Sequence, residues 1–163
     1  MNILWGYLSI LLGYLLGSIP TAVLFGRYLG KVDLCTEGDG HISATAVYRK
    51  FGRIPFVSTV AIDVAKGAAA VVLAYLIGGD LPMVIAAGAM AMVGHCWSVF
   101  MKFRGGLGGT VIIGVLVGFA WWQALICLAA MGILFFIVRK STLSTVLLAV
   151  FMVIALYITK NDW

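Results

Sequence analysis

The sequence predicts an all-α, polytopic integral membrane protein with about six transmembrane or half-membrane helices. Of the 163 residues, 63% are hydrophobic and only 10% are charged, far below the roughly 25% charged residues of a soluble domain. Long apolar runs alternate with short basic or glycine-rich segments, as in a chain that crosses the membrane repeatedly. A soluble globule, a disordered chain and a nucleic-acid binder are disfavoured together. The length fits a single transmembrane domain over residues 1–163.

Three predicted spans occupy the first part of the chain. They are 1–26, 54–77 and 83–101. The first is uncharged, and Pro20 is expected to bend or break its helix near 17–20 because proline lacks a backbone donor. The second contains Asp63 and Lys66, and the third contains His95. A Gly-Gly-Asp-Leu-Pro turn separates the second span from the third.

The C-terminal part is harder to divide into spans. Residues 110–138 are uncharged and too long for one span, so we expect two crossings joined at Trp121-Trp122, because aromatic residues favour the interface. The first crossing, 111–120, is then a half-span that must be sheltered from lipid. The last predicted span is 143–158.

Basic residues concentrate in the segments between the predicted spans. These segments are 27–53, 102–109 and 139–140. Alternate crossings place all three on one membrane face, and the positive-inside rule makes that face cytoplasmic. Both termini are then expected on the opposite side.

The first cytoplasmic loop contains a candidate anion site. Gly38 and Gly40 allow a ligand to approach the backbone closely. Thr45 and Arg49 are four residues apart, so one helix face can present both. A hydroxyl beside a guanidinium suits a phosphate. The alternative is a solvated loop with Arg49 at the lipid headgroups.

The second loop, 102–109, is basic and rich in glycine. Its candidate anion-binding residues are Lys102, Arg104, Gly105, Gly106 and Gly108. Backbone N–H groups at the start of the following helix favour an anion. The loop is not a Walker A motif, because the Gly-Lys-Ser/Thr ending is missing. The alternative is a flexible turn that only obeys the charge topology.

Three polar residues lie inside predicted spans, where charges are costly and usually face a polar interior. Asp63 and Lys66 are three residues apart and can pair on one helix face. We interpret Asp63 as one half of a structural pair and leave Lys66 open as part of an anion pocket. His95 is more often a packed, hydrogen-bonded histidine than a catalyst in such a position.

Several enzyme classes lack their motifs in this chain. There is no G-x-S-x-G elbow, no H-E-x-x-H, and no histidine followed five positions later by aspartate. Two histidines and three dispersed cysteines give no metal cluster, so we expect neither a metal nor a cofactor.

Four segments, in order along the chain, resemble the PlsY family of bacterial acyl-phosphate:glycerol-3-phosphate acyltransferases. They are Gly-Ser-Ile-Pro at 17–20, the glycine-containing loop 38–49, Ile-Asp-Val-Ala-Lys-Gly at 62–67, and Gly-His at 94–95 followed by 102–108. The likeness runs from the first span to about Thr145. It implies a PlsY-like membrane fold in the bacterial cytoplasmic (inner) membrane, with the motif loops in the cytoplasm.

The resemblance also implies a reaction and a set of site residues. A fatty acyl group passes from acyl phosphate to glycerol 3-phosphate, giving lysophosphatidate. Acyl phosphate is already activated, so no covalent nucleophile is needed, and the leaving phosphate can accept the hydroxyl proton. The implied catalytic residues are Thr45, Arg49 and His95. The implied phosphate-binding residues are Gly38, Gly40, Lys66, Lys102, Arg104, Gly105, Gly106 and Gly108. Membrane lipid is a further expected partner, and nucleic acid is not.

Departures from the family pattern leave a second hypothesis open. Asp39, His41, Ser43 and Ala46 replace the serine, asparagine, glycine and second asparagine of the family's first loop, and Leu107 replaces a lysine. One misplaced unit charge at ~4 Å costs on the order of 4 kcal/mol at an effective dielectric near 20. The alternative is therefore a catalytically degenerate, structural or binding subunit of a membrane complex, with partner subunits.

Overall fold

The structure, a computed structural model, describes residues 3–30 and 44–119. These residues all lie in the first of two compact units, Met1–Phe119. The second unit, Ala120–Trp163, falls outside the described residues. The predicted aromatic turn, the last basic loop and the last span fall outside them too. The single domain over the whole chain stays a prediction.

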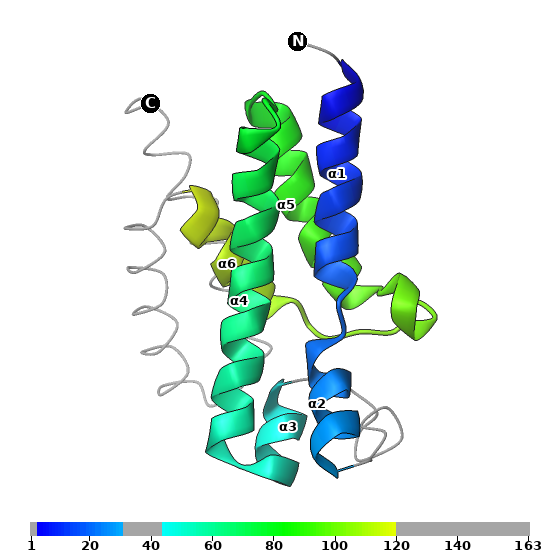
Figure 1. Cartoon of the computed structure of the whole chain (residues 1–163), viewed down its shortest axis with the longest axis vertical. Helices are drawn as coiled ribbons and strands as arrows, with labels where there is room; N and C mark the ends of the chain where they lie inside the picture. Colours follow the sequence, from blue (N-terminus) through cyan, green and yellow to red (C-terminus); the bar gives the residue numbers. More distant parts are fainter. Residues whose placement is uncertain (1–2, 31–43, 120–163) are drawn as a thin grey trace. The chain divides into compact units, whose positions relative to one another are not determined.

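The described residues are helical. The elements are α1 (Ile3–Ser18), α2 (Thr21–Gly30), α3 (Ala44–Phe51), α4 (Arg53–Leu76), α5 (Leu81–Cys96), the 3-10 helix η1 (Val99–Met101) and α6 (Gly109–Phe119). Within this part of the chain there is no β-strand, only an isolated antiparallel bridge between Ser98 and Arg104. Figure 1 shows α2, α3 and the start of α4 together at one end of the unit. The all-α prediction is confirmed.

The predicted break in the first span is present. α1 ends at Ser18 and α2 begins at Thr21, because Pro20 cannot donate a hydrogen bond into a continuous helix. α2 runs to Gly30, four residues beyond the expected end of the span. Taken across the break, Leu4–Gly30 is long and apolar enough to cross a membrane, and so is α4. α4 also matches the predicted second span to within one residue at each end.

The third predicted span is wrong at its C-terminal end. α5 begins at the predicted turn, where the Asp80 carboxylate accepts from the Met83 N–H at 3.2 Å. It stops at Cys96 and not at Met101. The Ser98 carbonyl then accepts from the backbone N–H groups of Met101 and Phe103. These local hydrogen bonds replace the helical ones and turn the chain into the 3-10 helix.

The predicted cytoplasmic stretch 27–53 is not a simple loop, because it contains α3. Val47 of α3 is fully buried against Ala22 and Val23 of α2. Gly52 follows α3 with φ of +82°, a value that glycine adopts without strain. The chain therefore reverses within one residue and enters α4.

Close helix contacts depend on glycines. A Cβ at Gly13 would lie 2.3 Å from the Ala87 carbonyl oxygen of α5, and one at Gly17 would lie 1.9 Å from that of Ala91. Gly114 of α6 meets the backbone of α4 in the same way. Small residues four apart allow membrane helices to approach at backbone distance. These glycines therefore allow α1 to pack closely against α5, and α6 to pack closely against α4.

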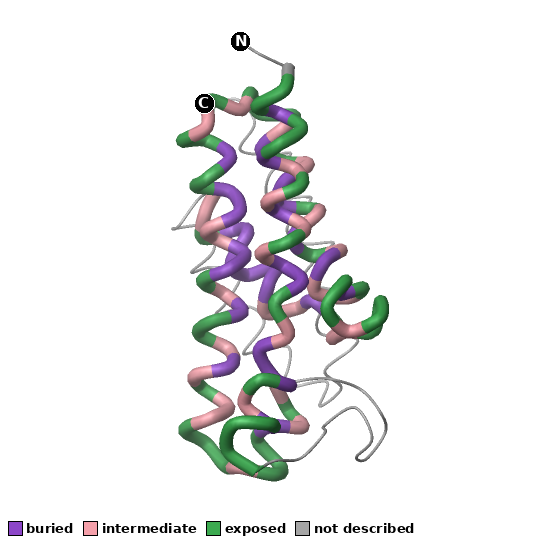
Figure 2. Tube along the Cα trace, turned by 45° about the vertical axis from the view of Figure 1, so that its right-hand side comes forward, coloured by how far each residue is buried: buried purple, intermediate pink, exposed green. Residues whose placement is uncertain are grey.

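The core of the described unit is formed by small apolar residues of α4, α5 and α6. Its buried members are Ala70, Val71, Ala74, Val84, Ala87, Ala91, Val111 and Val115. Figure 2 shows buried residues where helices face one another and exposed residues on their outer sides. Leu4 and Leu11 of α1 are 74% and 53% exposed, which suits contact with lipid chains.

We expect Gly17→Ala to lower the free energy of unfolding by roughly 1–3 kcal/mol, because its methyl group overlaps backbone that cannot move aside. SDS titration of the protein in mixed micelles measures this change. The matched control is Gly6→Ala on the same helix, whose Cβ meets only side-chain atoms of Met83 at 3.0 Å. Equal losses in the two variants would contradict close backbone packing at Gly17.

Candidate functional site

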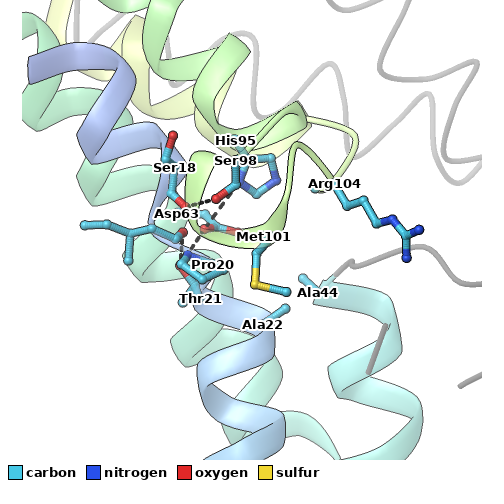
Figure 3. Close-up of a pocket in the computed structure, with 13 residues that line it drawn as sticks. Ser18, Pro20, Thr21, Ala22, Ala44, Asp63, His95, Ser98, Met101 and Arg104 are labelled. Atoms are coloured by element: carbon cyan, nitrogen blue, oxygen red, sulfur yellow. Dashed lines mark hydrogen bonds and ion pairs between the residues drawn. The ribbon is translucent and has the colours of Figure 1, made fainter. Parts of the chain in front are cut away.

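A small cavity lies where the break between α1 and α2 meets the C-terminal end of α5 (Figure 3). It encloses about 20 Å³, room for roughly one water molecule. The helix break contributes residues 18–22 to its wall, and the glycine loop, 102–109, contributes Arg104, Gly105 and Gly106. The remaining lining residues are Ala44, Asp63, His95, Ser98 and Met101.

Asp63 is a buried carboxylate that binds donors from three helices. Its Oδ1 accepts from the Thr21 hydroxyl of α2 at 2.9 Å and lies 2.8 Å from Nζ of Lys66 on α4. Its Oδ2 accepts from the Thr110 hydroxyl of α6 at 3.3 Å. Asp63 is only 3% exposed, and a buried charge of this kind is tolerated when it is paired and hydrogen-bonded.

Lys66 is the cation of this buried pair, so the pairing expected from the three-residue spacing is confirmed. Its Nζ also donates to the Ile19 carbonyl at 2.9 Å and lies 3.0 Å from Nδ1 of His95. Ile19 stands between α1 and α2. The ammonium therefore holds the helix break, α4 and α5 together from inside the unit.

His95 is a hydrogen-bonded histidine on the cavity wall. Nδ1 lies 3.9 Å from Oδ1 of Asp63, which is too far for a hydrogen bond, so its polar partner is Lys66. The His95 carbonyl accepts from the Gly106 N–H at 3.1 Å. Backbone and side chain of this residue thus connect the glycine loop to the Asp63–Lys66 pair.

The glycine loop has a defined turn, which disfavours the alternative of a flexible linker. Lys102 and Phe103 have positive φ values of 53° and 60°, a region that L-residues other than glycine seldom adopt. A Cβ at Gly105 would lie 2.0 Å from the His95 carbonyl oxygen. Only glycine fits at this position, and its packing presses the loop against the end of α5.

The start of α6 contacts an anionic side chain of the same chain, the Asp63 carboxylate, through the Thr110 hydroxyl. Thr110 is the second residue of α6 and donates to Asp63. A carboxylate is favourable at a helix N-terminus because of the aligned peptide dipoles. The Gly106 N–H, which the sequence offered to a phosphate, is engaged by the His95 carbonyl.

The structure brings part of the predicted site together. His95, Arg104, Gly105 and Gly106 line the cavity, and Lys66 reaches it through Asp63. Figure 3 shows the Arg104 side chain extending outward, away from Asp63 and His95. Of the two other predicted residues of this loop, Lys102 is exposed and Gly108 is buried against Cys96 and Met92.

The remaining predicted residues lie on α3 or outside the described part. Thr45 and Arg49 are exposed on α3, whose first residue, Ala44, lines the cavity. Gly38 and Gly40 lie outside the described residues. The assignment of all these residues to one phosphate site stays a prediction.

Sequence reasoning missed the hydroxyl groups of the site. Thr21 and Thr110 bind Asp63, and the Ser98 hydroxyl donates to the Ser18 carbonyl at 2.5 Å. The position of Thr21 directly after Pro20 was a usable local signal, because the break frees polar groups that need partners. No local signal pointed to Thr110 or Ser98.

The described residues hold no cluster for a metal ion. Within 3–30 and 44–119, no three His, Cys, Asp or Glu side chains gather where they could bind one metal. Asp63 and His95 share the cavity wall, but both already face the Lys66 ammonium. A cation beside that ammonium would be repelled.

Comparison with known sequences identifies relatives over most of the chain. The family described as glycerol-3-phosphate acyltransferase matches residues 7–162. Glycerol-3-phosphate acyltransferase 2 of Moorella thermoacetica is 42% identical over 126 residues, which are 75% of this chain and 64% of the relative. The Brucella suis glycerol-3-phosphate acyltransferase is 37% identical over 154 residues, which are 94% of this chain and 76% of the relative. The chain thus matches less than two thirds of the Moorella protein.

The fold is similar to that of a solved membrane enzyme. The crystal structure of PlsY, an integral membrane glycerol 3-phosphate acyltransferase in its glycerol 3-phosphate form, superposes with a TM-score of 0.86 at 26% identity. The match covers 94% of this chain and 77% of PlsY. The predicted family and the integral membrane fold are confirmed, whereas the number of spans stays a prediction.

Proposed function

Because this chain belongs to the glycerol-3-phosphate acyltransferase family, we propose that it transfers a fatty acyl group from acyl phosphate to glycerol 3-phosphate. The products are lysophosphatidate and inorganic phosphate. One structural observation supports this best. A cavity at a helix break is lined by His95, Arg104 and the paired carboxylate Asp63, in a chain that matches the family over residues 7–162.

In this reaction the protein has to position the two substrates and stabilise the charge that develops on their oxygens. The 1-hydroxyl oxygen of glycerol 3-phosphate attacks the acyl carbonyl carbon, and the bond from that carbon to the phosphate oxygen breaks. The leaving phosphate takes the hydroxyl proton, so atoms and charges balance without a protein base. Fixed donors around the carbonyl and phosphoryl oxygens lower the barrier because they need no reorganisation during the reaction.

The residues divide between the mouth and the wall of the cavity. Arg104 has the fork of donors that binds phosphate in a bidentate manner, and Lys102 adds an exposed cation two residues away. His95 supplies a side chain at the wall. Thr45 and Arg49, on the helix that begins at the cavity with Ala44, supply a hydroxyl and a second guanidinium. Gly105 and Gly108 pack the loop backbone against α5, and the Gly106 N–H donates to the His95 carbonyl.

The alternative of a degenerate structural subunit is not favoured. The relatives are named as acyltransferases. The buried Asp63 carboxylate and Lys66 ammonium retain their partners, whereas loss of catalytic constraint would allow an apolar pair of equal volume. Partner subunits are therefore not needed to explain the site.

Assay of the purified protein in proteoliposomes tests the proposal. Acyl phosphate and radiolabelled glycerol 3-phosphate are supplied together, and we expect labelled lysophosphatidate with release of one phosphate per product. Omitting acyl phosphate is the control. No product above that control, from protein that is monodisperse and thermally stable, would contradict the acyltransferase function.

We further propose that the motif loops face the cytoplasm of a bacterial inner membrane, as their basic residues indicate. In a cysteine-free background, Lys102→Cys and Lys140→Cys are expected to react with an impermeant thiol reagent only from the cytoplasmic side. Inside-out and right-side-out vesicles separate the two sides. Labelling of these positions from opposite faces would contradict the topology.

A further inference from the structure

The hydrogen count at Lys66 determines which nitrogen of the His95 ring carries a proton. An ammonium group has three hydrogens and no acceptor. Nζ of Lys66 lies 2.8–3.0 Å from three acceptor positions: Oδ1 of Asp63, the Ile19 carbonyl oxygen and Nδ1 of His95. Each hydrogen therefore has one partner. Nδ1 has to accept, because a proton on it would point at the ammonium.

The surrounding groups disfavour the other states of the ring. Nδ1 is 3.9 Å from Oδ1 of Asp63, so Asp63 cannot take an Nδ1 proton directly. Both oxygens of Asp63 are occupied by Thr21, Thr110 and Lys66. A doubly protonated ring would bring a second cation to within 3.0 Å of the ammonium. What remains is a neutral ring with its proton on Nε2.

We propose that Asp63 and Lys66 are positioning residues that hold His95 as a neutral Nε2–H donor to a phosphoryl oxygen in the cavity. Lys66 does not line the cavity, whereas His95 does. Within the part of the chain that the structure describes, Lys66 engages Nδ1, which leaves Nε2 for a ligand. The same geometry excludes a general-base role for His95, because its one acceptor lone pair is used by Lys66.

The donor role rests on the proposed acyl transfer, in which both substrates carry phosphoryl oxygens. A donor fixed by packing and by a second hydrogen bond stabilises developing charge better than a mobile one. Asp63 acts through Lys66, and Lys66 acts through the ring. Lys66 does not line the cavity, and both oxygens of Asp63 are already bonded to Thr21, Thr110 and Lys66, so their effect is expected in turnover more than in substrate affinity.

The ring state can be measured without activity. The chain has two histidines, His41 and His95, so ¹⁵N-histidine labelling of the protein in nanodiscs gives two rings. Comparison with His95→Gln assigns them. We expect an acceptor-type ¹⁵N shift at Nδ1 of His95 and a protonated-type shift at Nε2. A proton on Nδ1, or on both nitrogens, would overturn the proposal.

Ligand titration of the same sample tests the donor role. The His95 Nε2–H proton signal is expected to move with glycerol 3-phosphate or with inorganic phosphate, and not with glycerol. The ligand that moves it, glycerol 3-phosphate or inorganic phosphate, identifies which phosphate the ring binds. No movement with either would overturn the donor role. Since these readouts do not need turnover, a failed acyltransferase assay and a failed ring assignment are distinguishable.

Two substitutions at His95 separate the possible roles in turnover. The amide nitrogen of His95→Gln reaches about the place of Nε2, and the amide of His95→Asn reaches about that of Nδ1. We expect His95→Gln to retain kcat within about tenfold and His95→Asn to lose about 10²–10³-fold, as for loss of one oxyanion-type donor. A structural role predicts the reverse order, and a general base predicts equal loss in both. Either result would contradict the proposal.

Discussion

Asp63→Ala is expected to lower the free energy of unfolding by about 3–5 kcal/mol and acyl transfer by at least about 10²-fold. The reason is electrostatic: the change leaves the Lys66 ammonium, 5% exposed, without its counter-charge in a buried place. It also removes the acceptor of the Thr21 and Thr110 hydroxyls. SDS titration measures the first effect, and product formation per folded protein measures the second.

The double variant Asp63→Ala/Lys66→Met distinguishes stability from positioning. Removing both charges of a buried pair often restores most of the stability that removing one destroys. We therefore expect the double variant to unfold close to wild type while its acyl transfer stays low, because His95 has lost the donor that orients it. Recovery of turnover together with stability would show that the pair only supports packing.

Asp80→Ala is the matched control for a lost carboxylate. Asp80 is exposed and caps the N-terminus of α5, so its removal costs about 1 kcal/mol. α5 has 16 residues and is thus about 24 Å long, which separates Asp80 from the cavity at the other end. Acyl transfer is expected to be unchanged within twofold.

Local features of the site were predictable from the sequence because their causes are local. Pro20 interrupts any helix that contains it, and the break stands where the sequence placed it. Asp63 and Lys66 are three apart on one helix, so their pairing needs no tertiary information. The glycines of the loop were instead interpreted as an anion site, and the close approach of Gly105 to the His95 carbonyl was not predicted.

The partners of the pair were not predictable, because they depend on the packing of distant segments. Thr21 is 42 residues from Asp63 in sequence, and Thr110 and Ile19 are each 47 residues from the charge they contact. The predicted end of α5 was wrong for the same reason, because it too depends on contacts with a distant segment. Hydropathy alone continues that helix to Met101, whereas the fit of Gly105 against His95 requires the chain to turn at Trp97.

These long-range contacts also change how the glycine loop is interpreted. The sequence assigned its backbone N–H groups to a phosphate, but the Gly106 N–H donates to the His95 carbonyl, and the Thr110 hydroxyl at the start of α6 donates to Asp63. Fewer backbone N–H groups are then available to a phosphate, so we expect the cationic side chains of this loop to contribute more of its binding. Arg104 is the one that also lines the cavity.

Arg104→Ala is therefore expected to raise KM for glycerol 3-phosphate by about 10–100-fold, with a smaller change in kcat. A hydrogen bond to a charged group contributes roughly 1.5–3 kcal/mol, and losing that free energy weakens binding by about 10–100-fold. Arg104→Lys keeps the charge but loses the bidentate fork, so its KM is expected to lie between those of wild type and Arg104→Ala. Steady-state kinetics at fixed acyl phosphate concentration measures all three proteins.

The control for general charge is Arg27→Ala, which removes an exposed arginine of α2 that does not line the cavity. Its KM is expected to stay within about twofold of wild type. Added salt screens exposed charges over about 10 Å at 0.1 M, so it should weaken glycerol 3-phosphate binding in wild type and in Arg27→Ala but much less in Arg104→Ala. If both alanine variants raise KM equally, the basic face attracts the substrate as a whole and Arg104 has no particular place in the site. If only Arg104→Ala does so, the Arg104 guanidinium binds a phosphoryl oxygen of glycerol 3-phosphate beside the cavity that His95 lines.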